Sequence, residues 1–207
     1  MDYSYCTIKE FGTDEITEKR SRFIGYVKPV SNEEEAQSFV AEIKSKHYDA
    51  KHNIFAYIIR EPHVCRYSDD GEPQSTAGLP VLKMLENRGL TDIAVVVTRY
   101  FGGILLGTGG LVRAYTDAAS AALEKTPLRQ MKLYAKVSVK CDYSFYGVLT
   151  PMIYAHDGRV DDTLYEDAIT VNFFLPTENV DAFKASLTDS SRGTLTATVG
   201  DSVFLEN

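Results

Sequence analysis

The sequence has few cysteines, no long apolar run and no excess of positive charge, and each shortage excludes a class of protein. Its three cysteines are widely separated and odd in number, so they predict neither a disulfide framework nor a paired-cysteine zinc site. The longest apolar runs, such as 93–97, are far too short to cross a bilayer. The first residues lack the basic and apolar segments of a signal peptide. We therefore expect a cytoplasmic protein that does not enter a membrane.

The charge argues against a protein that grips nucleic acid by bulk attraction, because the net charge is −7. This charge is unevenly distributed. Residues 1–130 carry 16 Lys and Arg against 18 Asp and Glu, a net of −2, whereas residues 131–207 carry 6 against 11, a net of −5. A local basic patch is therefore compatible with the N-terminal part, and the acidic C-terminal part is a poor candidate for phosphate binding.

Residues 1–130 show the pattern of a mixed α/β domain. Apolar periodicity predicts strands at 3–9, 15–30, 53–59, 64–68 and 92–98. Helices are predicted to begin near an N-cap at 31–32, at Thr76 or Gly78, and near 109, and to end near 46, 88 and 125. The continuous apolar run after Asp92 is typical of a strand that is buried on both faces.

Residues 131–207 have the pattern of a second domain. Strands are predicted at 133–141, 159–164, 168–175 and 195–205, and helices at 144–155 and 177–187, with Thr177 as a candidate N-cap. This βαββαβ order is the ferredoxin-like arrangement. The predicted fold class is therefore α+β, with two domains at 1–130 and 131–207.

Glycine is concentrated in two short clusters. Seven of the fourteen glycines lie within 68–80 and 98–115. Such clusters usually mark positive φ angles or another group's backbone at close range. We expect the two clusters to converge on one solvent-facing rim that presents cationic groups, and a ligand to bind there.

Three carboxylates surround the glycine of the first cluster. Asp69, Asp70 and Glu72 could hold a hard cation such as Mg²⁺ or pair with arginines. Asp-Gly and Glu-Pro are also turn dipeptides, and Asp side chains cap backbone N–H groups. We favour the turn, because the spacing matches no dedicated metal loop. No metal is predicted, and the loop-shaping residues are Asp69, Asp70, Gly71, Glu72 and Thr76.

The second cluster follows a buried strand that ends in an arginine and a tyrosine. An arginine at the carboxyl end of a strand offers a planar fork to phosphate or carboxylate, although an ion pair with the first cluster explains it equally well. The glycines can expose N–H groups near a helix start, but no Walker A motif is present. The predicted ligand or nucleic-acid contacts are Lys51, His52, Arg99, Tyr100, Gly102, Gly103, Gly109, Gly110 and Arg113.

Two of these contacts have simpler alternatives. Arg113 lies one turn before Asp117, so an ion pair within the helix would account for it. His52 could act as a general base, but no motif links a Ser or Cys nucleophile to it, so packing is the favoured explanation. No catalytic residue is predicted.

Taken together, the motifs resemble those of the YigZ/IMPACT family. The matching segments are Asp-Asp-Gly-Glu-Pro at 69–73, Thr-Ala-Gly-x-Pro at 76–80, Thr-Arg-Tyr-Phe-Gly-Gly at 98–103, Leu-Gly-x-Gly-Gly-Leu-Val-Arg-Ala-Tyr at 106–115, Ser-Arg-Phe at 21–23 and Ala-Lys-His at 50–52. The resemblance covers about residues 15–125, and the rest is similar to the extra domain of the bacterial members. Ser75 stands where the family usually has glycine.

The resemblance implies an N-terminal two-layer α/β domain, like those of small-subunit ribosomal proteins, elongation factor G and RNase PH. It also implies a C-terminal ferredoxin-like domain similar to the last domain of elongation factor G. Eukaryotic IMPACT proteins are associated with translational control through a partner protein. Fold likeness is itself a weak guide to function.

Three functions are compatible with these observations. The leading one is a non-catalytic, cofactor-free cytoplasmic module, monomeric or weakly oligomeric, that binds RNA, the ribosome or a translation-associated protein. The second is an undiscovered enzyme or phosphate-binding protein that uses the two glycine clusters. The third is an adaptor whose acidic C-terminal domain meets a basic partner.

Overall fold

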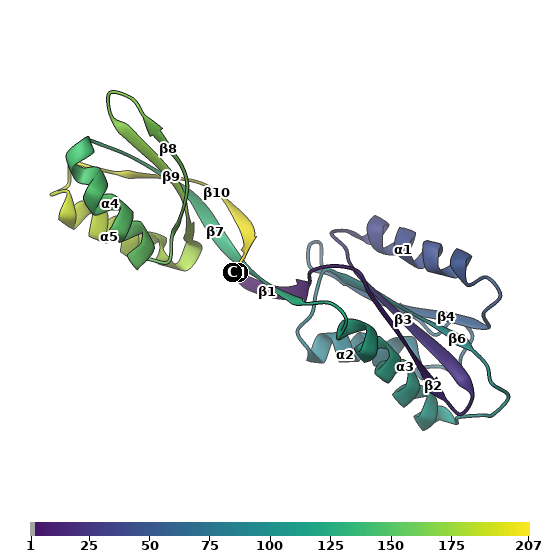
Figure 1. Ribbon diagram of the computed structural model, residues 1–207. Coiled ribbons are helices and arrows are strands. Elements are labelled where there is room, and N and C mark those ends of the chain that lie inside the picture. The colour runs from purple at the N-terminus through teal and green to yellow at the C-terminus, as the bar shows by residue number, and fades with distance from the viewer. Residues whose placement is uncertain (1–2) are drawn as a thin grey trace. The chain divides into compact units, whose positions relative to one another are not determined.

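The computed structural model describes residues 3–207, which divide into two compact units (Figure 1). The N-terminal unit is Tyr5–Gln130, and the C-terminal unit is Met131–Asn207 together with residues 3 and 4. Residues 1 and 2, which open the first predicted domain, lie outside the described residues. The two sheets and five α-helices confirm the predicted α+β class. Within 3–207, no helix is both long and apolar enough to span a bilayer.

The N-terminal unit is built on an antiparallel sheet with the strand order β2-β3-β6-β4-β5. The strands are β2 (Gly12–Glu18), β3 (Ser21–Pro29), β4 (His52–Ile59), β5 (Val64–Ser68) and β6 (Ile93–Tyr100), and the helices are α1 (Glu33–Lys46), α2 (Gly78–Asn87) and α3 (Thr108–Leu123). Helix α1 covers one face of the sheet, and α2 and α3 cover the other (Figure 1). The unit therefore has three layers, whereas the resemblance implied two.

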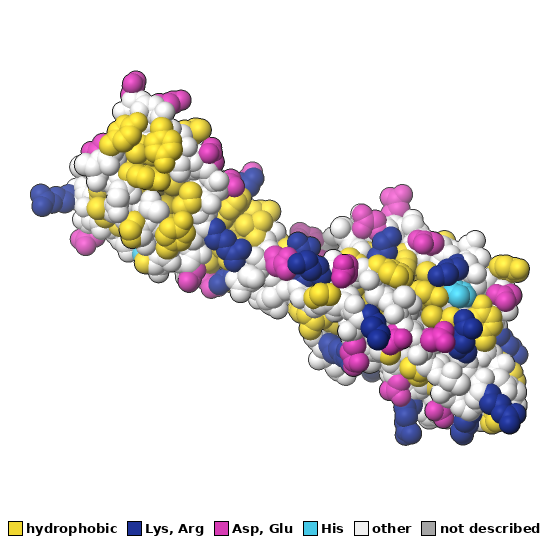
Figure 2. Space-filling view, viewed as in Figure 1, with side chains coloured by type: hydrophobic (Ala, Val, Ile, Leu, Met, Phe, Trp, Pro, Cys, Tyr) yellow, Lys and Arg dark blue, Asp and Glu magenta, His cyan; other side chains and the backbone are white. Residues whose placement is uncertain are grey.

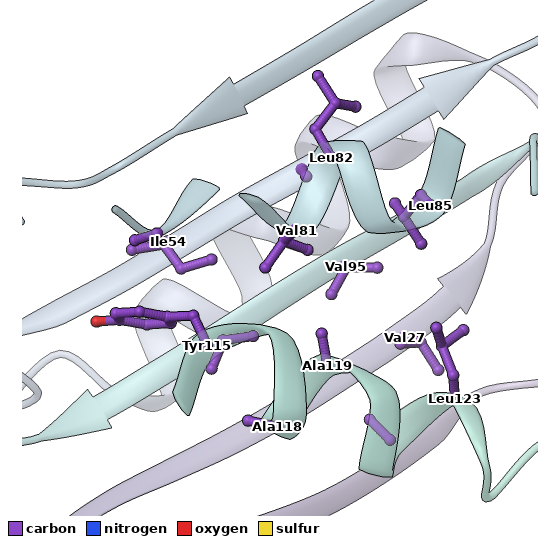
Figure 3. Close-up of a cluster of buried hydrophobic side chains, with 14 of the residues drawn as sticks. Val27, Ile54, Val81, Leu82, Leu85, Val95, Tyr115, Ala118, Ala119 and Leu123 are labelled. Atoms are coloured by element: carbon purple, nitrogen blue, oxygen red, sulfur yellow. The ribbon is translucent and has the colours of Figure 1, made fainter. Parts of the chain in front are cut away.

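Strand β6 shows why helices are needed on both faces of this sheet. Ile93, Val95 and Val97 belong to the core under α2 and α3, and Ala94 and Val96 belong to the core under α1. The prediction of a strand buried on both faces is confirmed. Figure 3 shows side chains of α2 and α3 pointing at the sheet residues between them.

Helix α3 approaches the sheet closely because small residues face one another. A Cβ atom at Gly25 of β3 would lie 2.3 Å from the backbone oxygen of Ala118. Only glycine fits there, and this close contact fixes the helix that leads into the second glycine cluster. The predicted narrow stripe of small residues on this helix is confirmed, since Ala118, Ala119 and Ala122 are fully buried.

Two local predictions in this unit are wrong. The single strand predicted at 15–30 is a hairpin, with Lys19 and Arg20 in the turn at φ angles of 45° and 65°. Neither Thr76 nor Gly78 caps α2; the N-cap position is Ala77, and the Asp69 carboxylate accepts the free N–H groups. By contrast, Asn32 caps α1 as predicted and accepts from the Glu35 N–H at 2.9 Å.

The C-terminal unit has the predicted ferredoxin-like order. Its strands lie in the order β10-β7-β9-β8, with α4 and α5 packed together on the sheet. The bounds are β7 (Leu128–Cys141), α4 (Tyr143–Ala155), β8 (Arg159–Tyr165), β9 (Ile169–Pro176), α5 (Val180–Ser190) and β10 (Ala197–Glu206). Strand β1 (Ser4–Ile8) also pairs with β7. Thr177 is not an N-cap: it opens a 3-10 turn, and its hydroxyl donates to the Leu133 carbonyl.

Candidate functional site

The two glycine clusters meet at one pocket of about 400 Å³ in the N-terminal unit. We call residues 69–77 the first glycine loop and residues 101–107 the second glycine loop. The first supplies Glu72 and Pro73, the second supplies Phe101 and 105–107, and the remaining lining residues are Lys51, His52, Arg99, Thr108 and Leu111. Most of this lining is apolar, and its few polar groups converge at the base.

A buried ion pair forms the polar end of the pocket. Arg99 comes from the end of β6, opposite His52 of β4 in the sheet register, and its Nη1 donates to Glu72 Oε1. The two side chains are only 7% and 4% exposed. The Tyr115 hydroxyl donates to the same oxygen at 2.7 Å. Burial, aided by the Glu72 carboxylate, raises the pKa of Tyr115, so this hydroxyl stays protonated and remains a donor.

The Arg99 guanidinium is therefore neutralised inside the protein. Its Cζ lies 5.3 Å from the ring centre of Phe23 and 5.4 Å from that of Phe101. Its Nε is buried and has no hydrogen-bond partner among residues 3–207. Of the two explanations offered by the sequence, the ion pair is the one found, but the partner is Glu72 instead of Asp69 or Asp70.

His52 is held at the mouth of the first glycine loop. Its Nδ1 lies 2.7 Å from the carbonyl oxygen of Asp70, and its Nε2 lies 3.8 Å from Glu72 Oε1. Lining residues from the described chain include neither Ser nor Cys. The arrangement fits packing and hydrogen bonding better than nucleophilic catalysis.

The carboxylates of the first glycine loop serve the fold. Asp69 accepts from the backbone N–H groups of Ser75, Ala77 and Gly78 at 2.8, 3.1 and 2.8 Å, which caps α2. Asp70 accepts from Lys44 Nζ at 2.8 Å and from the Asn53 N–H at 2.7 Å. Across residues 3–207, no group of three or more His, Cys, Asp or Glu side chains is placed to hold a metal ion.

The second glycine loop is open to solvent. Leu105 at its tip is 82% exposed, and Phe101 and Ile104 are also exposed. Gly102 lies so close to the turn between β2 and β3 that a Cβ atom would sit 2.0 Å from the Arg20 carbonyl carbon. Helix α3 begins after Gly107 with no side-chain cap, so its first N–H groups face the pocket end.

Tyr100 and Arg113, both predicted contacts, lie away from the pocket. Tyr100 follows Arg99 on β6 and therefore faces the other side of the sheet, where its hydroxyl bonds to His47 Nδ1 at 2.9 Å. Arg113 is exposed on α3 and lines a separate hollow together with Lys19. Within 3–207, no ion pair joins Arg113 to Asp117, so the expected helical pair is not seen.

Free cations surround the pocket on the side of the second glycine loop. Lys19, Arg20, Lys51 and Arg113 take part in no ion pair within the described part of the chain. Figure 2 shows Lys and Arg side chains projecting at the end of the unit where Figure 1 places the β2–β3 turn and the loop after β6. Unpaired Glu18 and Asp117 lie beside two of them, so the local excess of positive charge is modest.

The sequence did not identify several of the lining residues. Phe101, Leu105 and Leu106 escaped notice, although three apolar side chains inside a glycine-rich loop are a usable signal, because a loop of that composition has no core to bury them in. Lys19 and Arg20 were missed because they were assigned to a strand.

The fold and the pocket together define a two-unit α+β protein with one glycine-bordered binding site. Residues 19–123 match the family described as the Impact N-terminal domain, and residues 139–194 match a domain of unknown function (DUF1949). The chain is 37% identical to "IMPACT family member YvyE" of Bacillus subtilis (strain 168), covering all of this chain and 95% of that protein. It is 36% identical to "IMPACT family member YigZ" of Escherichia coli (strain K12), covering 86% and 88% of the two.

The chain belongs to the IMPACT family. "Protein IMPACT" of Mus musculus is 34% identical over 137 residues, which cover 61% of this chain and 42% of that protein. A solved structure entitled "Crystal structure of an hypothetical protein" matches with a TM-score of 0.62 at 32% identity, over 97% of this chain and 99% of that one. The resemblance inferred from the sequence motifs is confirmed.

Proposed function

We propose that this protein is a non-catalytic, cytoplasmic module that acts in translation, and that its N-terminal unit binds single-stranded RNA at the pocket after β6. The observation that supports this most is the combination of an apolar pocket, an exposed aromatic and aliphatic rim, and unpaired cations outside it. Proteins bind single strands with this combination, because bases stack on apolar side chains while cations follow the phosphates.

The pocket accommodates one unstacked base. Phe101 and Leu105 offer apolar surface to the face of the base, and a volume of about 400 Å³ has room for it. Glu72 and Arg99 present an acceptor and donors at the closed end, where the edge of a base would lie. The flanking phosphates then fall near Lys51 and the free N–H groups at the start of α3.

The cations favour a polymer over a small ligand. Lys51 lines the pocket, but Arg113 and Lys19 line a neighbouring hollow that shares only Leu106 with it. A single nucleotide in the pocket would leave those two cations unused, whereas a strand with phosphates on both sides of the bound base would reach them. Arg99 is not one of the phosphate contacts, since Glu72 already neutralises it.

The test measures binding of a fluorescein-labelled oligouridine of about ten nucleotides by anisotropy over a range of salt concentrations. The double variant Lys51→Ser/Arg113→Ser should bind at least about tenfold more weakly, with a salt slope reduced by about two, because each lost phosphate contact lowers the slope by about one. The matched control is Lys140→Ser/Lys184→Ser, which removes two exposed cations from the C-terminal unit. Equal affinity of both double variants and the unaltered protein would remove this surface from the proposal.

A second candidate is supported by the pocket itself: a small phosphorylated ligand held by Lys51 and the start of α3. Thermal-shift measurements with nucleoside mono- and triphosphates, with and without Mg²⁺, separate the two. Stabilisation by a free nucleotide that Arg113→Ser leaves unchanged would favour the small ligand. Stabilisation by the oligonucleotide alone would favour RNA.

A further inference from the structure

The C-terminal unit carries an exposed tyrosine surface that the proposed RNA site does not use. Tyr143 and Tyr146 of α4 and Tyr165 of β8 form a connected group: the Tyr146 and Tyr165 hydroxyls lie 3.2 Å apart, and the Tyr143 hydroxyl donates to the Glu166 carbonyl. Tyr143 and Tyr165 are 60% and 61% exposed. We call these three residues, with Val148 and Tyr154 of the same helix, the tyrosine surface.

Helix α4 is apolar but only partly covered. Only Leu149 and Ile153 of its thirteen residues are buried, although most of its side chains are aromatic or aliphatic. Figure 2 shows hydrophobic side chains gathered over the C-terminal unit in the view that has α4 in front. Exposed apolar groups that lie together in this way, bordered by polar ones, mark interaction sites on soluble proteins.

The border of this surface is acidic. Asp142 precedes Tyr143 as the N-cap of α4, and Glu166 and Asp167 follow Tyr165. Residues 142–181 hold eight carboxylates and a single cation; these are Asp142, Asp157, Asp161, Asp162, Glu166, Asp167, Glu178 and Asp181 against Arg159. Such a border repels nucleic acid and also repels a second copy of this chain, because the whole chain has a net charge of −7.

We propose that the tyrosine surface binds an Arg- and Lys-rich segment of a partner protein. Tyrosine rings attract guanidinium and ammonium groups through their π faces, and the surrounding carboxylates supply the opposite charge that positions such a segment. Tyrosine and arginine are also the residue types that contribute most to protein interfaces. This proposal does not depend on RNA binding by the N-terminal unit.

The experiment uses the full chain and two labelled peptides of about twelve residues, one made of Arg-Gly-Leu repeats and the other of Glu-Gly-Leu repeats. The Arg peptide should bind, and the Glu peptide should not. Tyr143→Ala/Tyr165→Ala should weaken binding of the Arg peptide by about tenfold or more, as expected when two stacked cations are lost. The matched control is Tyr48→Ala, which removes an 87% exposed tyrosine from the N-terminal unit.

Two further variants protect the test against misfolding. Tyr143→Phe/Tyr165→Phe keeps the rings and should retain most of the affinity, and Glu166→Lys/Asp167→Lys keeps the tyrosines and should abolish binding. Similar affinity for both peptides, or undiminished binding by the charge-reversed variant, would overturn the proposal. So would a concentration-dependent dimer that Tyr143→Ala/Tyr165→Ala dissociates, because the occupant would then be a second copy. Oligouridine binding should be unchanged in all of these variants if it occurs at the N-terminal pocket.

Discussion

The two glycine loops have similar compositions but opposite structural roles. The first glycine loop is fixed by its own carboxylates: Asp69 caps a helix, Asp70 joins α1 to β4, and Glu72 pairs with Arg99. Gly78, at the end of this segment, lies where a Cβ atom would sit 2.5 Å from the Ser68 oxygen. In this loop, glycine serves to let two pieces of backbone approach each other.

The second glycine loop has no such anchors. Residues 101–110 contain no titratable side chain, and the loop's apolar residues point to solvent or line the pocket. Here glycine permits a chain path that exposes Leu105 and the start of α3. The comparison teaches that a glycine cluster alone does not mark a ligand site. The distinguishing feature is whether the side chains between the glycines find partners inside the protein.

Glu72→Ala should have the largest effect, because it tests whether the first glycine loop is truly a structural element. The substitution leaves the Arg99 guanidinium buried without its charge partner, and it removes the acceptor of the Tyr115 hydroxyl. Breaking a buried pair from one side costs about 3–5 kcal/mol of unfolding free energy. Urea denaturation followed by circular dichroism measures the loss.

The comparison variant lies in the other loop. Leu105→Ala removes an exposed side chain and should change the unfolding free energy by less than about 0.5 kcal/mol. If Glu72→Ala cost less than Leu105→Ala, the assignment of roles to the two loops would be reversed. The double variant Arg99→Met/Glu72→Leu should recover part of the stability, because it leaves no unpaired buried charge.

Acid pH should loosen the first glycine loop and spare the second. Burial alone would raise the pKa of Asp70, but the Lys44 ammonium and the Asn53 N–H outweigh it, so the pKa lies below its ordinary value. The stabilisation is complete above the usual Asp pKa of about 3.9 and is lost as the pH falls through the lower pKa of the folded state. Hydrogen exchange of the two loops, compared between neutral and acid pH, measures this.

Asp70→Ala is the matched variant for this prediction. It should lower the unfolding free energy by about 1–3 kcal/mol at neutral pH, because the Asn53 N–H loses its acceptor. Its acid-limb titration should also be shallower than that of the unaltered chain, since this carboxylate no longer takes up a proton. An acid limb identical in the two proteins would mean that Asp70 does not anchor the loop.

The sequence predicted the elements whose signals are local. The apolar run of β6, the Asn32 cap and the βαββαβ order of the C-terminal unit were all visible as short patterns. The turn at Lys19 and Arg20 was invisible, because left-handed φ angles in a tight hairpin usually call for Asn or Gly. Only a partner on another strand explains why two long cations occupy it.

The pocket was predictable in outline but not in chemistry. Glycine clustering brought the right two loops together in the argument, but two neighbours on β6 were both assigned to one site. Arg99 and Tyr100 point to opposite faces because side chains alternate along a strand. The cap of α2 was missed for a different reason: its acceptor, Asp69, lies eight or more residues upstream, and only a folded loop brings it to the helix.

Ser75→Gly should have the smallest effect, and it separates the two uses of glycine most cleanly. Ser75 is exposed at a φ of 62°, while its N–H donates to Asp69, so a residue without Cβ would keep the bond and relieve the strain. The gain is partly offset by the greater freedom of glycine in the unfolded chain, which leaves a net stabilisation of about 0.5 kcal/mol. Gly103→Ser in the second loop, at a φ of 84° with no neighbour within 4 Å, should do the reverse and destabilise by about 1 kcal/mol. Thermal denaturation of both variants decides the matter, because a loss of stability in Ser75→Gly would mean that the serine side chain itself supports the first loop.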